Sequence, residues 1–194
     1  MKNLRVFSLA ALFVFLFGVF IDGCKKESNP ATPPEEVEHP PATAVTFAIT
    51  DNATGAVDTC MVRDTTLVPG GVALIGSLNL TAGHSYHGTF RLYDESANPV
   101  KVVTEDIISE ADAHIFLETP SDTNRVKISN SDKDSKGLLF GMNFTITVIS
   151  GAAATGTIHV VLQHHDDGIK FNSDGTYHEP YDFDLDADYP YTIQ

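Results

Sequence analysis

Hydrophobic and polar side chains alternate along much of the chain beyond residue 43, and this period of two predicts β-strands. In residues 44–49 every second side chain is large and hydrophobic, and a segment of turn composition follows. Breaks rich in Gly, Asn, Asp and Ser separate such segments at short intervals, so residues 43–194 are expected to form one antiparallel β-sandwich or barrel. The same alternation recurs in residues 86–92, 144–148 and 157–162.

One segment, residues 104–112, departs from this rhythm and predicts a short helix. Thr104 has the hydroxyl group of a helix N-cap, and the acidic residues that follow suit the positive end of a helix dipole. Asp106, Glu110 and His114 follow one another at four-residue spacing. A helix that reached His114 would therefore place these three side chains on one face.

The N-terminus has the pattern of an export signal. A stretch from Val6 to Ile21 that is apolar except for Ser8 follows the basic residues Lys2 and Arg5. A membrane-spanning helix needs about 20 apolar residues, so this shorter stretch predicts a signal peptide over residues 1–23.

The end of this stretch, Ile21-Asp22-Gly23-Cys24, resembles the lipobox of bacterial lipoproteins. The resemblance implies cleavage before Cys24, attachment of lipid to its sulfur, and a mature protein anchored in the membrane. Lys25 in the next position implies transfer to the outer membrane. Asp22 departs from the small residue usual at that position, so an uncleaved N-terminal anchor and an ordinary secretory signal remain as alternatives.

Residues 24–42 are rich in Pro and Glu and contain one aliphatic residue, Val37. Such a composition cannot build a core and predicts a disordered linker between the lipidated cysteine and the folded domain. The whole chain has 26 acidic and 12 basic residues and a net charge of −14. This acidity argues against nucleic acid as a partner, and it permits cation binding without demonstrating it.

Cysteine usage and motifs give little sign of covalent chemistry. The chain has 2 cysteines, so with Cys24 lipidated only Cys60 remains, and no disulfide framework is expected. Cys60 lies in the apolar segment Thr59–Val62, which predicts a small buried hydrophobic residue. Because the chain lacks a G-x-S-x-G elbow, an H-E-x-x-H pair and a phosphate loop, we expect a protein that is not an enzyme.

Two histidine-containing segments are candidates for binding a divalent metal ion. The first carries Asp106, Glu110 and His114 at helical spacing, and the second is His164-His165 beside two aspartates at the end of a predicted strand. Imidazole and carboxylate ligands suit zinc, copper or nickel. The alternatives are a solvated acidic helix face next to a hydrogen-bonded histidine, and a polar turn.

Two acidic segments are candidates for calcium. A strand over the C-terminal one would present four carboxylates on one face, either as a weak calcium-binding strip or as charge that protects an outer strand from aggregation. The segment 132–137 is similar to a calcium loop, but Lys136 stands where the third oxygen ligand is needed, so a surface turn is expected. The four acids of the strip are Asp182, Asp184, Asp186 and Asp188.

Three segments, Val103–Phe116, Asp132–Gly137 and Leu162–His164, resemble recurring segments of an uncharacterised group of Gram-negative bacterial lipoproteins. Members are sometimes labelled as type 1 periplasmic-binding folds, which require long helices that this sequence lacks. The resemblance implies a lipid-anchored envelope protein and brings no established activity. Leu80–Gly83 followed by Tyr86 resembles a turn and strand start of immunoglobulin-like exported modules, which implies an immunoglobulin-like sandwich with one short helix.

Two hypotheses of function follow. In the first, the protein is a lipid-anchored binding module that captures a divalent metal ion for an outer-membrane transporter. In the second, it is a structural or adhesive immunoglobulin-like surface lipoprotein with no small ligand. The first hypothesis predicts that His114, His164 and Asp106 or Glu110 lie within a few ångströms of one another.

Overall fold

Large hydrophobic side chains at every second position give each long strand one hydrophobic side. Two sheets pack face to face and bury these sides between them. In the strands Ser85–Asp94 and Asn143–Val148 buried residues alternate with more exposed ones along the whole length. The computed structural model describes residues 40–66, 73–129 and 131–194. The predicted signal peptide, Cys24 and the linker up to residue 39 lie outside the described residues.

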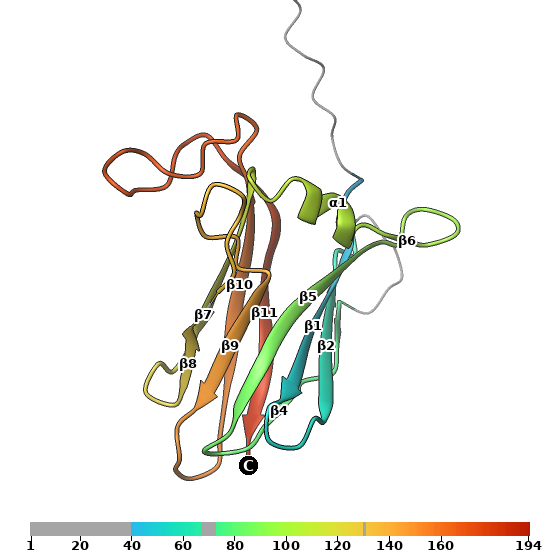
Figure 1. Cartoon of the computed structure of the whole chain (residues 1–194). Helices are drawn as coiled ribbons and strands as arrows, with labels where there is room; N and C mark the ends of the chain where they lie inside the picture. The colour runs from blue at the N-terminus through green and yellow to red at the C-terminus, as the bar shows by residue number, and fades with distance from the viewer. Residues whose placement is uncertain (1–39, 67–72, 130) are drawn as a thin grey trace, which may run out of the picture. The chain divides into compact units, whose positions relative to one another are not determined.

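The strands are β1 (Ala44–Asp51), β2 (Val57–Arg63), β3 (Leu74–Ile75), β4 (Leu78–Leu80), β5 (Ser85–Asp94), β6 (Lys101–Val102), β7 (His114–Pro120), β8 (Val126–Ser129), β9 (Asn143–Val148), β10 (Ala154–His164) and β11 (Asp182–Ile193). The larger sheet has the order β3-β2-β1-β5-β9-β8, with β6 paired to β5, and the smaller sheet has the order β4-β11-β10-β7. Neighbours are antiparallel except β4 and β11. This arrangement confirms the predicted all-β sandwich with one short helix (Figure 1).

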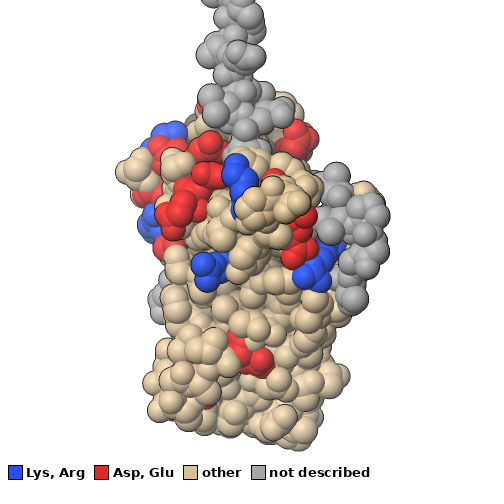
Figure 2. Space-filling view, turned by 90° about the vertical axis from the view of Figure 1, so that its right-hand side faces the viewer, with Lys and Arg blue, Asp and Glu red and all other residues tan. Residues whose placement is uncertain are grey.

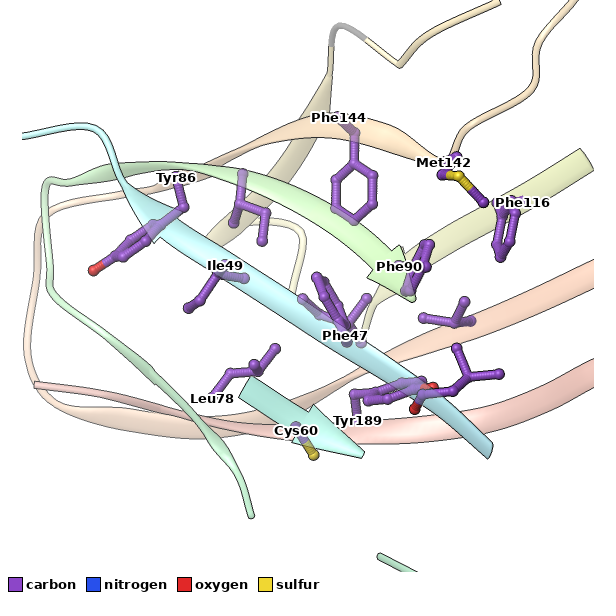
Figure 3. Packing of buried hydrophobic residues seen from close by; sticks show 14 of the residues in the cluster. Phe47, Ile49, Cys60, Leu78, Tyr86, Phe90, Phe116, Met142, Phe144 and Tyr189 are labelled. Carbon is purple, nitrogen blue, oxygen red and sulfur yellow. The ribbon is translucent and has the colours of Figure 1, made fainter. Parts of the chain in front are cut away.

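Aromatic side chains at the centre of the sandwich join the two sheets (Figure 3). The ring of Phe47 lies 4.9 Å from that of Phe90 and 5.5 Å from that of Phe144 in its own sheet, and 5.4 Å from that of Tyr189 in the other sheet. Tyr189 is completely buried and donates its hydroxyl hydrogen to the backbone oxygen of Val45 at 3.0 Å. Because that bond satisfies the buried hydroxyl, Tyr189 ties the sheets together through both packing and a hydrogen bond.

The helix α1 (Thr104–Ser109) is shorter than the predicted segment 104–112 and is capped differently. Val103 occupies the N-cap position, and no side chain makes a capping bond there. The hydroxyl oxygen of Thr104 instead accepts a hydrogen bond from the backbone N–H of Leu92 at 3.0 Å and lies 3.3 Å from the Leu92 oxygen. The hydroxyl group that was predicted to cap the helix therefore attaches the start of α1 to β5.

One end of the sandwich carries α1 and the longer loops, and charged side chains gather there on the face that Figure 2 shows. Figure 1 shows α1 and the loops 131–142 and 165–181 at the same end. Figure 2 shows Lys, Arg, Asp and Glu side chains concentrated in that half of the visible face and sparse in the other. No helix of the described residues has the length and apolar character that crossing a membrane requires.

Candidate metal centre

Glu110, His114 and His164 converge at the end of the sandwich that carries α1. One nitrogen or carboxylate oxygen from each residue lies within 4.8 Å of the other two. Glu110 is the C-cap residue of α1, His114 opens β7, and His164 ends β10. The strand register pairs His164 directly with His114, so the sheet brings the two imidazoles together and the end of α1 adds the carboxylate.

The hydrogen bonding of His114 determines which of its ring nitrogens is left for a ligand. Its side chain is completely buried, and Nδ1 lies 2.9 Å from the backbone oxygen of Glu110. A carbonyl oxygen only accepts, so Nδ1 carries the hydrogen in this bond. Nε2 is then the nitrogen that holds a proton or a metal ion, and it lies 3.4 Å from Oδ2 of Asp184. Histidines that bind metals commonly donate their other ring N–H to such a backbone carbonyl.

A β-bulge in β11 explains how Asp184 reaches His114. The register of β10 and β11 pairs Leu162 with Leu185 and Gln163 with Phe183, which leaves Asp184 as the extra residue. Bulges reorient a side chain and are frequent beside functional sites. Asp184 was expected only in the acidic strip, and the bulge places its carboxylate next to His114, although Asp184 is not one of the three residues whose ligand atoms lie within 4.8 Å of one another.

The same bulge corrects the prediction that four acids share one face of β11. Asp186 and Asp188 lie on the outer side of the sheet, where their carboxylate oxygens are 3.6 and 3.2 Å from the ring nitrogens of His159. Asp182 is instead paired with His164, on the core-facing side of β10. An extra residue reverses the alternation of a strand, so no continuous strip of four carboxylates forms.

His164 forms the solvent side of the cluster. Its ring is stacked on that of His114 with the centroids 4.5 Å apart and the planes at 7°. The His164 side chain is 22% exposed, and its Nδ1 lies 3.7 Å from Oδ1 of Asp166. Glu110 is also partly exposed. The cluster therefore has one buried, fixed ligand candidate, His114, and two candidates that an ion reaches from solvent.

A buried lysine fixes the backbone around this cluster. Nζ of Lys170 lies 2.6 Å from Oδ2 of Asp134, and neither side chain is exposed. Nζ also donates hydrogen bonds to the backbone oxygens of Ala111, His114 and Leu139 at 3.0, 3.0 and 2.7 Å. Burial lowers the pKa of the Lys170 ammonium group, and the carboxylate of Asp134 opposes that shift. Because Nζ binds the carbonyl of His114 itself, Lys170 positions one of the candidate ligands.

The segment 132–137 is a turn, as predicted, but its central aspartate is buried. Oδ1 of Asp134 accepts hydrogen bonds from the backbone N–H groups of Lys136 and Leu138 at 2.9 and 2.8 Å. Burial raises the pKa of Asp134, but Lys170 and these N–H groups outweigh burial, and the net shift is downward. No local pattern in the sequence marks Lys170 as its partner, so this network was missed.

Two of the predicted candidates, Asp106 and His165, lie outside the cluster. His165 is completely buried, and its ring centroid is 5.3 Å from that of Tyr181. Burial lowers the pKa of His165, so this imidazole is neutral at neutral pH. Cys60 is also completely buried, which confirms the predicted small buried residue, and burial raises the pKa of its thiol to about 11.

The donor set of the cluster fits a transition-metal dication. Two imidazoles with one or two carboxylates are common zinc ligands, with bonds of about 2.0–2.2 Å and ligand atoms therefore about 3.4 Å apart in a tetrahedral site. The candidate ligand atoms of Glu110, His114 and His164 lie within 4.8 Å of one another, and the two imidazole planes are stacked at 7°, so the His164 ring must turn out of the stack as the ligands close on an ion. Glu110 and His164 are partly exposed and have room for this movement, while His114 is held in place.

Comparison with protein-family models, with curated proteins and with solved structures finds no match to this chain.

Proposed function

We propose that this protein is a lipid-anchored binding module of the bacterial cell envelope that holds one divalent transition-metal ion, most favourably Zn²⁺. His114, His164 and Glu110 are the proposed ligands, with Asp184 as the fourth. The observation that carries this proposal is the orientation of His114, whose Nδ1 is held by the Glu110 carbonyl so that Nε2 points to Asp184.

The charge balance of the cluster favours a metal ion over a proton. A proton on Nε2 of His114 would form an ion pair with Asp184 and offset one carboxylate. A dication in the same place offsets the carboxylates of both Asp184 and Glu110 and binds the second imidazole as well. Both carboxylates are only partly exposed, so water screens their mutual repulsion incompletely and a dication would relieve it.

The exposure of the site suits capture and delivery. Partly exposed ligands at Glu110 and His164 leave a path to solvent, and the chain's net charge of −14 raises the local concentration of cations.

We propose that lipid on Cys24 anchors the module in the outer membrane and that an outer-membrane transporter is its partner. The alternative is a structural or adhesive surface lipoprotein in which these histidine–carboxylate contacts only stabilise the fold.

Competition titration with a chromophoric zinc chelator, on purified protein without a histidine tag, separates the two functions. We expect one Zn²⁺ per chain. His114→Ala and His164→Ala should weaken binding by more than the roughly 10–100-fold lost with a second-shell partner. His87→Ala, which removes an exposed histidine from β5, is the matched control and should bind as tightly as the wild type. Equal affinity in all four proteins, or no binding, would leave the structural alternative.

The anchor has its own test. Cells that express the protein and are fed radiolabelled palmitate should incorporate label into the wild type and not into Cys24→Ser. Label in both proteins, or in neither, would contradict lipid attachment at Cys24.

A further inference from the structure

A groove of about 570 Å³ lies at one side of the sandwich, between the edge strands of the two sheets. β8 ends the larger sheet and β7 ends the smaller one, on the same side of the molecule (Figure 1). Both strands and the turn 121–125 between them line the groove, which has the size of a small-molecule site. Glu118 and Lys127 are the charged residues of this lining.

Glu118 occupies a position of β7 that faces the core. The strand register pairs it with Val160 of β10, which is completely buried, and directly paired residues lie on the same face of a sheet. Phe116, two residues earlier on the same face, is also completely buried. A carboxyl group in such a place is costly unless a cation or hydrogen-bond donors compensate it.

The described part of the chain does not supply that compensation. Oε1 of Glu118 is buried and has no hydrogen-bond partner there. Lys127 is exposed on β8 between Val126 and Ile128, which pack in the core. Because side chains alternate along a strand, the Lys127 ammonium group points to the outer face of the larger sheet, away from Glu118.

A second carboxylate adds negative charge beside Glu118. Oδ1 of Asp132 is also buried without a partner in the described ranges, and Oδ2 accepts a hydrogen bond from Nδ2 of Asn143 at 2.8 Å. Burial and the nearby Asp132 raise the pKa of Glu118 to about 8, so at neutral pH a proton neutralises it. A positively charged group in place of that proton would also be attracted by Asp132.

We propose that this groove binds a small organic cation, whose ammonium group contacts the Glu118 carboxylate and whose apolar body lies against Pro120, Val126 and Ile128. The Glu118 proton passes to solvent when the cation binds. This inference does not depend on the proposed metal site and stands if no metal binds.

The probe is 4-fluorobenzylammonium, titrated into the purified protein and followed by ¹⁹F NMR at pH 8. We expect saturable binding, with amide shifts that map to β7, β8 and the turn 121–125. The neutral analogue 4-fluorobenzyl alcohol should bind at least about tenfold more weakly, because it lacks the charge that Glu118 recognises. Since Glu118 must lose its proton, affinity for the cation should rise about tenfold from pH 6 to pH 7 and by less on each further unit.

Variants locate the contact. Glu118→Gln keeps the shape of the side chain and should weaken binding of the cation at least about tenfold. Glu105→Gln makes the same change at an exposed acid on α1 and should have no effect. Equal affinity for the cation and the alcohol, wild-type affinity in Glu118→Gln, amide shifts that map elsewhere, or no binding at about 10 mM probe would overturn the proposal.

Discussion

Nζ of Lys170 and Oδ2 of Asp134 lie 2.6 Å apart, and both side chains are completely buried. The ion pair joins the loop 165–181 to the loop 131–142, and the same ammonium group binds the backbone oxygen of His114 at 3.0 Å. A contact between two loops thereby supports the backbone that carries a proposed metal ligand.

Replacing one member of this pair should be far more harmful than replacing both. Lys170→Met leaves the Asp134 carboxylate buried without its counter-charge, so we expect the free energy of unfolding to fall by about 3–5 kcal/mol. Lys170→Met/Asp134→Leu removes both charges and should recover part of that loss. Urea unfolding of the two variants measures the difference.

Lys133→Met is the control for this prediction, because Lys133 is an exposed lysine in the same loop. It should change the free energy of unfolding by less than about 0.5 kcal/mol. If Lys170→Met were as mild as Lys133→Met, the buried ion pair would not support the fold.

Glu118 should make the protein less stable as the pH rises. Oε1 of Glu118 is buried and has no hydrogen-bond partner in the described part of the chain, and burial raises the pKa of this carboxyl group from 4.5 to about 8. Between these two values the folded protein holds a proton that the unfolded chain has lost. The contribution of Glu118 to stability is therefore largest below about pH 4.5 and decreases toward pH 8, by up to about 1.4 kcal/mol per unit.

Urea unfolding of Glu118→Gln between pH 5 and pH 8 checks this sign. The variant is expected to lose less stability than the wild type over that range and to be the more stable protein at pH 8. Glu105→Gln, at an exposed acid on α1, should follow the wild type. Parallel pH curves for wild type and Glu118→Gln would show that the carboxyl group is ionised at no cost in the folded state.

The thiol of Cys60 should be unreactive in the folded protein. It is completely buried, and its pKa of about 11 leaves little thiolate at neutral pH. In a Cys24→Ser variant, where Cys60 is the remaining cysteine, an aromatic disulfide reagent at pH 8 should react only after denaturant is added. Rapid stoichiometric reaction without denaturant would mean that β2 opens readily.

Sequence patterns predicted the parts of this molecule that depend on local alternation. The strands around Phe47 and Phe144 follow from their period of two, and the same period correctly placed His164 on the apolar side of β10. The helix ended earlier than predicted because Glu110 already leaves the helical conformation, and the backbone N–H groups of Ala111 and Ala113 make the i→i−3 bonds of turns to Ile108 and Glu110. Even so, His114, Glu110 and His164 were identified as candidates and do lie together.

The remaining features of the site depend on contacts between distant segments. The bulge at Asp184 has no signature in the alternating acids of β11, because it appears only when the strand pairs with β10. Lys170 lies in a loop, where a lysine is expected to be solvated, and its burial depends on Asp134 and three carbonyl groups. Neither could be derived without the tertiary arrangement.

The central claim is that a metal ion binds at Nε2 of His114 while Nδ1 keeps its hydrogen. Long-range ¹H–¹⁵N NMR spectra of the imidazole rings report both nitrogens of each histidine, before and after one equivalent of Zn²⁺ is added. We predict that Nε2 of His114 and one nitrogen of His164 move to the shifts of metal-bound nitrogen, while Nδ1 of His114 remains protonated and His87 is unchanged. Spectra in which His114 and His164 do not respond to Zn²⁺ would contradict the account.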